Sequence, residues 1–421
     1  MNKNKKIVLK LVLGFIFIMI VFALYILNET KDTINANPEN IDEKIGSFYN
    51  KNKNAGFAVS IFNKNGVLYQ KGFGYADLEN EIPYTTKTQQ YIASISKTTI
   101  GISLLKAEEL GLLKLNDPIN EHLPFKVINP KHPNKLITIK QLATHTSSLN
   151  YNENVVESLY IDEHLKNKSL KNIIENYFLN IKYGKISFTD NKPGSDFNYS
   201  NIGAGLAAYI IEYKSNMNYA AFTEKHIFNP IGLQNTHWFK TEVDSSLISK
   251  YYHFQNSNLE AVKSKGVQLY PARDLITNVE DLTTYCKSVM LNDPKVLSEL
   301  SYKKLLHKEL QNEITNKSHD NSGIFWLIDR NQYGITYQLT GMTGGDDYIN
   351  TIMMFDPKTN LGYIFIGNTG GSKYNRYHHI NIYRTLVSYG DYIIQNDNKN
   401  SFLTKLKFKW HNIYSRINGL F

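Results

Sequence analysis

Ser94 and Lys97 are residues whose types and spacing could perform nucleophilic chemistry. They lie three residues apart at the start of a predicted helix, so both side chains project from the same face. A serine hydroxyl is a weak nucleophile until a base removes its proton, and a lysine one turn away can act as that base. The N–H groups at a helix N-terminus also favour the negative charge that develops there. This spacing predicts an acylatable serine.

The Ser-x-x-Lys pattern by itself is weak evidence, because it also occurs at residues 103–106 and 301–304. Ser103 lies nine residues after Ser94, which places it about 180° around an α-helix and therefore on another face. The runs of sequence around Ser94 must distinguish it from the other two copies.

Tyr199 and Asn201 form a second candidate pair. Residues i and i+2 of an extended loop point to the same side, so both could face one cleft. A phenol beside a lysine can take a proton from a serine and later return one to a leaving group. A carboxamide can both donate to and accept from a substrate amide. The same Tyr-x-Asn pattern occurs at residues 348–350, but the position of Tyr199 after a Pro-Gly pair and before an apolar helix favours the first copy.

The elements that must position these residues can be read from hydrophobic periodicity. A β-hairpin is predicted over residues 57–62 and 67–74, with a glycine-bearing turn between them. Helical patterns follow at residues 94–111, from about 139, and at 202–212 and 279–291, and strands return at 323–328, 335–340, 350–355 and 361–366. This order predicts an α/β (α+β type) fold, with one antiparallel sheet built from both chain ends and a helical insertion between them.

Several runs, in order, resemble the serine β-lactamase-related family, which includes class C β-lactamases, D-alanyl-D-alanine carboxypeptidases, penicillin-binding-protein-like proteins and related esterases. The similar runs are residues 72–83, 92–97, 111–119, 137–149, 193–203 and 271–282, with Ser148 where a glycine is usual. The resemblance covers most of residues 45–395. It implies a β-lactamase/DD-peptidase-like fold, with Ser94, Lys97 and Tyr199 as the catalytic residues and Asn201 as a substrate-binding residue.

The third motif of that family departs from its usual form here. The family carries Lys-Thr-Gly or His-x-Gly on a strand beside the nucleophile. In this chain Thr343, Gly344 and Gly345 fit, but Met342 stands where the cation or imidazole belongs. The resemblance implies an oxyanion hole formed by the N–H groups of Ser94 and Gly345. The usual partner of a substrate carboxylate is missing, unless a basic residue farther along the chain replaces it: Lys373, Arg376, His378 or His379.

The N-terminus is expected to anchor the protein in a membrane. Four lysines in residues 1–10 precede an uncharged run at residues 11–27, at the short end of the length that spans a bilayer. No small-residue cleavage site and no cysteine follow the run, so we expect an uncleaved signal anchor, with the N-terminus cytoplasmic. The expected organisation is a basic end (1–10), an anchor (11–27), a linker (28–44), a hydrolase domain (45–396) and a basic amphipathic tail (397–421).

The charge distribution argues against a nucleic-acid-binding surface. The four lysines of residues 1–10 and the five basic residues of 399–421 equal the whole net charge of +9, so the charges of the intervening chain balance. The tail could lie on an anionic membrane or dock on the domain. The single cysteine, Cys286, permits no intrachain disulfide, and no Cys/His spacing suggests a metal site or a cofactor.

The sequence thus predicts a membrane-anchored, extracytoplasmic serine hydrolase that acts on small amides or esters, such as D-alanyl groups of the bacterial envelope. One alternative is an esterase for substrates without a carboxylate. Another is a penicillin-binding-like protein that senses or holds envelope ligands without turning them over, although such a protein would not need Ser94, Lys97 and Tyr199 together.

Overall fold

The structure of the protein is a computed structural model. It describes residues 36–49, 53–150, 160–161, 169–179, 187–255, 258–311, 321–330, 338–371 and 373–397, with single residues 14, 19 and 314. Apart from residues 14, 19 and 397, the expected anchor and tail lie outside the described residues, and the domain limits stay predictions. Within the described part of the chain, no helix has both the length and the apolar character needed to cross a bilayer.

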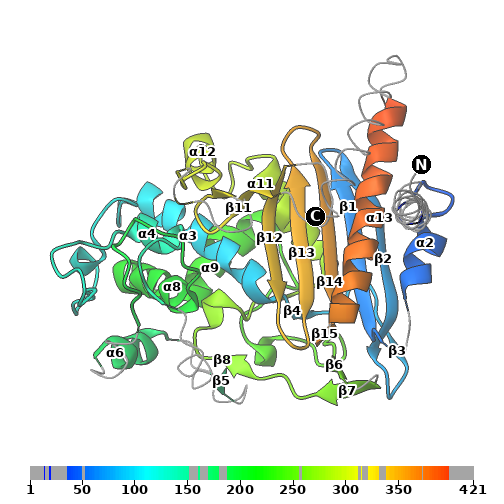
Figure 1. Ribbon diagram of the computed structural model, residues 1–421, viewed down its shortest axis with the longest axis horizontal. Coiled ribbons are helices and arrows are strands. Elements are labelled where there is room, and N and C mark those ends of the chain that lie inside the picture. The colour runs from blue at the N-terminus through cyan, green and yellow to red at the C-terminus, as the bar shows by residue number, and fades with distance from the viewer. Residues whose placement is uncertain are drawn as a thin grey trace, which may run out of the picture.

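An eight-stranded antiparallel sheet forms the centre of the fold, and both halves of the chain contribute to it (Figure 1). β1 pairs with β14 along its length, from Phe57 opposite Gly367 to Asn63 opposite Leu361. This pairing confirms the predicted sheet built from both chain ends. In spatial order the strands are β10 (Asn321–Ser322), β11 (Leu327–Arg330), β12 (Leu339–Gly345), β13 (Asn350–Asp356), β14 (Leu361–Gly367), β1 (Gly56–Asn63), β2 (Gly66–Asp77) and β3 (Ile82–Pro83).

The predicted hairpin is confirmed, whereas the predicted strand at residues 323–328 is wrong in its extent. The side-chain oxygen of Asn63 accepts hydrogen bonds from the N–H groups of Asn65 and Gly66 and so holds the β1–β2 turn. Residues 323–326 turn instead of extending, since the Gly323 N–H donates to the Trp326 carbonyl at 2.8 Å. The turn leaves two short strands, β10 and β11, where the apolar pattern predicted one.

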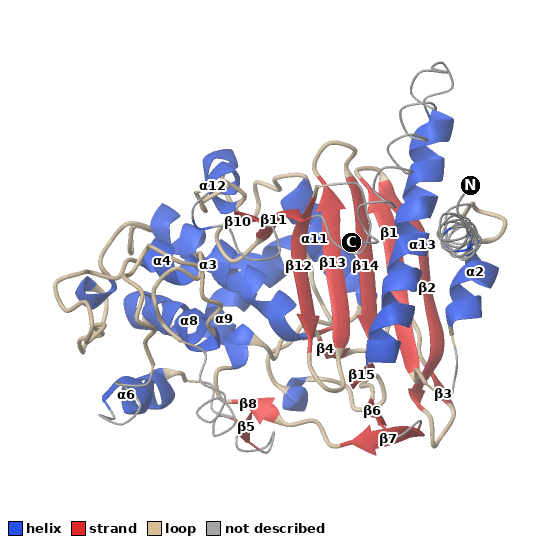
Figure 2. Ribbon diagram, in the orientation of Figure 1, coloured by secondary structure: helices blue, strands red, loops and turns tan. Residues whose placement is uncertain are grey.

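Helices cover both faces of the sheet (Figure 2). A hydrophobic core lies on each face. On one face, α2 (Ile41–Phe48) and α13 (Lys373–Asp397) cover the alternate residues Phe57, Val59 and Ile61 of β1. The other face packs against α11 (Val279–Met290) and the helical region, which together enclose the larger core. The period-2 alternation of β1 divides its apolar side chains between the two cores, since Ala58 and Phe62 belong to the larger one.

The helical region comes from the middle of the chain, as predicted, and α3 and α8 contact each other within it. Gly101 of α3 lies so close to the Ile324 carbonyl oxygen that a Cβ would come within 2.0 Å of it, so a larger residue would push the helix away. The helices are α3 (Lys97–Glu109), α4 (Ile139–Ala143), α6 (Lys171–Leu179), α8 (Asn201–Ser215), α9 (Tyr219–Thr223), the π-helical η4 (Glu224–Phe228), α10 (Asn229–Ile231) and α12 (Glu299–Leu305).

The remaining elements of the described chain are short. They are the paired strands β4 (Gln90–Tyr91) and β9 (Ile276–Thr277), and β5 (Tyr160–Ile161) and β8 (Gly266–Val267). A small sheet has the order β15 (Thr369–Gly371), β6 (Tyr251–Gln255) and β7 (Asn258–Val262). Single 3₁₀ turns are η1 (Ala93–Ser96), η2 (Ile119–Glu121), η5 (Lys240–Glu242) and η6 (Tyr270–Ala272).

Candidate active site

Ser94 lies in a tight 3₁₀ turn, η1, and not in the first α-helical turn as predicted. The α-helix α3 begins only at Lys97, so Ser94 and Lys97 still lie one turn apart. Ala93, directly before the serine, has a φ of +49°, a backbone conformation that costs a non-glycine residue about 1–3 kcal/mol. The side chain of Ser94 is half-buried, whereas its neighbours Ala93 and Ile95 are buried.

This turn is fastened to the segment around Leu275 by paired hydrogen bonds. The Ser96 hydroxyl donates to the Ala93 carbonyl at 2.7 Å and accepts from the Leu275 N–H at 3.1 Å. The Ile92 N–H donates to the Leu275 carbonyl at 3.0 Å. These contacts hold the strained backbone at Ala93, and with it the position of the Ser94 side chain.

Lys97 is completely buried, and its amino group contacts the serine hydroxyl. Lys97 Nζ lies 3.0 Å from Ser94 Oγ and donates to the carbonyl of Ala272 at 2.6 Å. Burial lowers the pKa of Lys97 to about 7; the positive charge of Arg273 acts in the same direction, and the carboxylate of Asp274 opposes it. A lysine with this pKa is uncharged in a large fraction of molecules near neutral pH and can then accept a proton.

Tyr199 contacts the same oxygen from the other side. Its hydroxyl donates to Ser94 Oγ at 2.9 Å, and Lys97 Nζ lies 5.1 Å from the centroid of its ring. Tyr199 immediately precedes the N-cap of α8, where Ser200 Oγ accepts from the Gly203 N–H at 3.0 Å. The structure therefore brings Tyr199 into contact with Ser94, from which it is separated by 105 positions in the sequence, beside Lys97.

Asn201 is the first residue of α8, and not part of an extended loop as predicted. Its side chain is half-buried, and its Oδ1 atom is buried without a hydrogen-bond partner among the described residues. A buried polar atom without a partner is costly. The amide is therefore available for a ligand, which agrees with the predicted substrate-binding role.

His145 positions Tyr199 and has no predicted role from the sequence. Its ring packs against the Tyr199 ring with centroids 4.5 Å apart. Its Nδ1 accepts from the Ser200 N–H at 3.2 Å, and its carbonyl accepts from the Asn198 N–H at 2.7 Å. Burial, with a smaller contribution from Lys97, lowers the pKa of His145 to about 3, so the ring stays neutral near pH 7. The only signal in the sequence was its place within the family-like run at residues 137–149.

β12 lies beside the serine turn, and glycine permits this close approach. A Cβ on Gly344 would come within 2.3 Å of the Ile92 carbonyl oxygen and 3.0 Å of the Ser94 nitrogen. In the adjoining turn, the Asp346 N–H donates to the Ile349 carbonyl. Because hydrogen-bonded and non-hydrogen-bonded pairs alternate, the next pair, Gly345 and Asn350, is non-hydrogen-bonded. The Gly345 N–H therefore points away from β13, as an oxyanion donor would.

Met342 and Thr343 precede these glycines on β12. Thr343 is half-buried, but Met342 is only 6% exposed and belongs to the larger hydrophobic core with Met353 of the neighbouring strand. Its thioether thus packs against apolar side chains. His378 lies on α13, which covers the other face of the sheet, and the side chains of Lys373 and Arg376 lie outside the described residues.

The competing sequence patterns occupy other parts of the fold. Ser103 is fully buried, with its hydroxyl 3.5 Å from that of Tyr219, and Ser301 is a buried partner of Ser298 on α12. The Tyr348 hydroxyl contacts Arg273, and not a serine.

The described residues thus assemble a serine nucleophile, two groups that can move its proton, a polar amide and a glycine-lined strand edge. This arrangement supports acyl transfer through a covalent serine intermediate. No cluster of three or more potential metal ligands occurs among the described residues.

Comparison with known proteins agrees with a serine enzyme of this kind. Residues 41–386 match the β-lactamase family profile. Protein flp of Staphylococcus aureus (strain MW2) is 26% identical over 339 residues, which cover 79% of this chain and 64% of flp. The chain therefore spans somewhat less than two thirds of the length of that relative.

Two solved structures show the same fold. The D-amino acid amidase from Ochrobactrum anthropi SV3 superposes with a TM-score of 0.68 at 20% identity, covering 87% of this chain and 99% of the amidase. EstCE1, a hydrolase with promiscuous acyltransferase activity, gives a TM-score of 0.66 at 18% identity, covering 82% of this chain and 99% of EstCE1. The family match covers most of the chain, so the protein belongs to the β-lactamase family of serine hydrolases.

Proposed function

We propose that this protein is a membrane-anchored, extracytoplasmic serine hydrolase that cleaves small amides or esters, with D-alanyl groups of the bacterial envelope as its substrates. One observation carries the hydrolase chemistry of this proposal: Ser94 Oγ contacts both Lys97 Nζ, at 3.0 Å, and the Tyr199 hydroxyl, at 2.9 Å. A binding module would not need a nucleophile in contact with a buried lysine of lowered pKa.

The reaction follows from these contacts. With Lys97 uncharged, Ser94 Oγ bonds to the substrate carbonyl carbon and the Ser94 hydroxyl loses its proton. Lys97 accepts this proton either directly or by way of Tyr199. The N–H groups of Ser94 and Gly345 stabilise the oxyanion. The bond to the leaving amine or alcohol then breaks, and the leaving group takes a proton from the Lys97–Tyr199 pair. Water adds to the acyl-enzyme, releases the acid and restores Ser94.

Covalent labelling tests this proposal. The purified protein is treated with a fluorophosphonate or a fluorescent penicillin, and the modified residue is located by mass spectrometry. We expect fluorophosphonate labelling at Ser94 and its loss in Ser94→Ala, while Ser103→Ala and Ser301→Ala keep it. Labelling that persists in Ser94→Ala would refute the nucleophile. A wild-type protein that binds envelope ligands but is not labelled would support the non-enzymatic alternative.

A specific observation favours esters without a carboxylate as substrates. Met342 carries no charge and packs in the core, at the position where the family usually has a group that pairs with the substrate carboxylate. A lost charge-assisted contact costs about 1.5–3 kcal/mol, or about 10- to 150-fold in acylation rate if it acts in the transition state. The likeness of the fold to EstCE1, a hydrolase with promiscuous acyltransferase activity, is consistent with this second candidate.

Relative acylation rates separate the two candidates. We expect slow acylation by penicillin, faster turnover of a neutral p-nitrophenyl ester, and a larger gain for penicillin than for the ester in Met342→Lys. Rapid penicillin acylation by the wild type, abolished by substitution of Lys373, Arg376 or His378, would instead assign the carboxylate contact to that residue and leave Met342 a packing role.

The proposed topology is supported by the lysines of residues 1–10 followed by the uncharged run at 11–27. Fractionation of cells expressing the full chain, with N-terminal sequencing, tests it. We expect the intact N-terminus in the membrane fraction. A soluble form beginning after residue 28 would show instead that the run is a cleaved signal peptide.

A further inference from the structure

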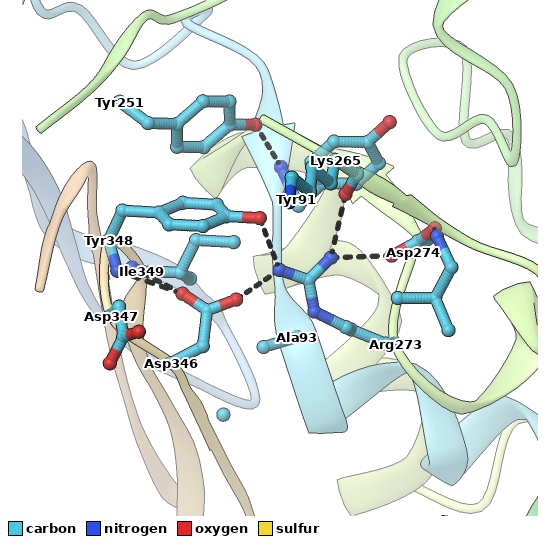
Figure 3. Close-up of polar contacts among 12 residues, drawn as sticks. Tyr91, Ala93, Tyr251, Lys265, Arg273, Asp274, Asp346, Asp347, Tyr348 and Ile349 are labelled. Atoms are coloured by element: carbon cyan, nitrogen blue, oxygen red, sulfur yellow. Dashed lines mark hydrogen bonds and ion pairs between the residues drawn. The ribbon is translucent and has the colours of Figure 1, made fainter. Parts of the chain in front are cut away.

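The charged side chain of Arg273 is buried, where an unpaired charge would cost a large free energy. The residue is 8% exposed and directly follows Ala272, whose carbonyl accepts from Lys97. Burial of a guanidinium is tolerated only when its donors are satisfied. The acceptors around it are Asp274 Oδ1 at 2.8 Å, the Tyr348 hydroxyl at 2.7 Å, the Lys265 carbonyl at 3.4 Å and a carboxylate oxygen of Asp346 (Figure 3).

Asp346 connects this cation to the strand edge beside Ser94. It immediately follows Gly345, the last residue of β12. Its Oδ2 pairs with Arg273, while its Oδ1 accepts from the N–H groups of Tyr348 and Ile349, both at 2.9 Å. The carboxylate therefore closes the β12–β13 turn and joins it to Arg273 in a single contact.

The segment of residues 272–274 thus contacts both parts of the site. The Ala272 carbonyl accepts from the amino group of Lys97, and Arg273 pairs with Asp346, the residue that follows Gly345. The same network reaches the strand before the nucleophile, since Tyr348 packs against Tyr251 with ring centroids 5.4 Å apart, and the Tyr251 hydroxyl accepts from the Tyr91 N–H at 2.9 Å.

We propose that Arg273 and Asp346 form an ionic clasp that holds Gly345 at the oxyanion position, with Arg273 also placing its positive charge beside Lys97. Both are positioning residues, because neither contacts the Ser94 hydroxyl. The inference rests on the proposed hydrolase function and deepens it, since it assigns the geometry of the oxyanion edge to a contact made across the site. It also implies that Arg273, already paired with two carboxylates, is not a ready partner for a substrate carboxylate.

The charge of Arg273 gives the clasp a signature that a purely structural ion pair would lack. The charged and titratable groups that face Lys97 are Arg273 and Asp274 after η6, Tyr199 before α8 and His145 after α4. Arg273 lowers the pKa of Lys97, so its removal should move the acidic limb of the pH–rate profile to higher pH. Asp346 does not act on Lys97 in this way, so its loss should leave the limb in place.

The test measures the second-order rate of fluorophosphonate labelling of Ser94 against pH, below the unfolding temperature of each variant. We expect Arg273→Gln and Asp346→Asn each to lower the plateau rate by about 10- to 100-fold, because a small misplacement of a catalytic group has effects of this size. Arg273→Gln should also shift the acidic limb to higher pH. The double variant should lose little more than either single variant, because the two residues act as one unit.

Arg273→Lys separates charge from geometry. A lysine keeps the positive charge but cannot bond several acceptors with a planar fork. We therefore expect a lowered plateau with the acidic limb near its wild-type position. Lys250→Gln is the matched control, because Lys250 also pairs with two carboxylates, those of Asp77 and Glu79, and it should retain the wild-type profile.

The outcomes distinguish this inference from the proposed function. A wild type that is not labelled at Ser94 would refute the hydrolase itself. A labelled wild type, with Arg273→Gln and Asp346→Asn labelled at the same rate and the same acidic limb, would overturn the clasp alone. If Arg273→Gln does not fold, Asp346→Asn and Arg273→Lys still decide, since wild-type plateau rates in both would refute the clasp.

Discussion

Lys97 is completely buried, whereas Ser94, one turn earlier, remains half-buried. Burial disfavours the ammonium form, so the lysine that holds Ser94 Oγ can also act as its base near neutral pH. The nearby charges oppose each other, because Arg273 lowers the pKa of Lys97 and Asp274 raises it. The chemistry at this scale therefore depends on where two charged side chains lie around one amino group.

Opposite substitutions should move the pH profile in opposite directions. Acylation requires uncharged Lys97, so the wild-type rate should rise with pH through about 7. Asp274→Asn removes the group that raises the pKa of Lys97, so its acidic limb should move to lower pH, the reverse of the shift expected for Arg273→Gln. Single-turnover acylation of a neutral ester from pH 5 to pH 9 measures both. If the acidic limbs of the Asp274→Asn and Arg273→Gln profiles fall at the same pH, Lys97 is not the titrating base.

Lys97 and Tyr199 should behave as one proton-transfer unit. Both contact Ser94 Oγ, so removal of either leaves the other without its function. We expect Lys97→Ala, Tyr199→Phe and the double variant to lower acylation by similar factors. Acylation rates of the three variants provide the measurement, and losses that multiply in the double variant would indicate separate proton paths.

At the scale of elements, the site depends on how closely β12 approaches η1. The gap is set by the missing side chain at Gly344, which faces the Ile92 carbonyl and the Ser94 N–H. Thr351 of β13 adds a hydrogen bond from its hydroxyl to the same Ile92 carbonyl at 2.9 Å. The strand edge and the serine turn therefore form one rigid junction.

A methyl group at Gly344 should open this junction. Its Cβ would lie 2.3 Å from the Ile92 carbonyl oxygen, so β12 must move away from Ser94. We expect Gly344→Ala to lower acylation by about 10²-fold or more. Gly46→Ala in α2 is the matched control, since no atom lies within 4 Å of the Cβ it would add, and it should retain the wild-type rate. Equal rates in the two variants, measured by labelling of Ser94, would contradict this role of the close approach.

At the scale of the whole molecule, the two cores bury ionisable groups that link stability to pH. His145 lies beside the site in the helical region, and His379 lies on α13, between the amides of Asn54 and Asn350. Burial lowers the pKa of each imidazole to about 3. Glu212 acts in the opposite sense, because burial raises the pKa of its carboxyl to about 7.

The free energy of unfolding should therefore fall as the pH is lowered from about 6.5. The unfolded chain protonates both histidines near pH 6.5, whereas the folded protein keeps them neutral until about pH 3, so their contribution is complete above pH 6.5 and is lost below it. Glu212 offsets part of this loss, since the folded protein takes up its proton first. Urea denaturation at pH 7.5 and pH 5 measures the change. The decrease in the free energy of unfolding between pH 7.5 and pH 5 should be smaller in His379→Gln and larger in Glu212→Gln. A wild-type free energy of unfolding that is equal at the two pH values would contradict the account.

The sequence by itself determined the local elements and the identity of the candidate nucleophile. The hairpin of β1 and β2 and the apolar strands β13 and β14 follow from alternation and turn residues, which act over a few residues. Ser94 was distinguished from the other Ser-x-x-Lys serines by the family-like runs around it. The order of strands and helices also predicted a sheet made from both chain ends, because apolar strands at either end need partners. The fold of the family could therefore be predicted.

Only the tertiary structure decided which distant residues meet. The roles of His145, Ala272, Arg273 and Asp346 could not be predicted from the neighbouring sequence, because they depend on contacts between segments tens to hundreds of residues apart. The same is true of the 3₁₀ turn at Ser94 and the break between β10 and β11, where the backbone makes hydrogen bonds to distant segments: Ile92 to Leu275, and Phe325 to Ala143. The lowered pKa of Lys97 also depends on the tertiary structure, because it follows from complete burial and from two charges that the fold brings beside the amino group.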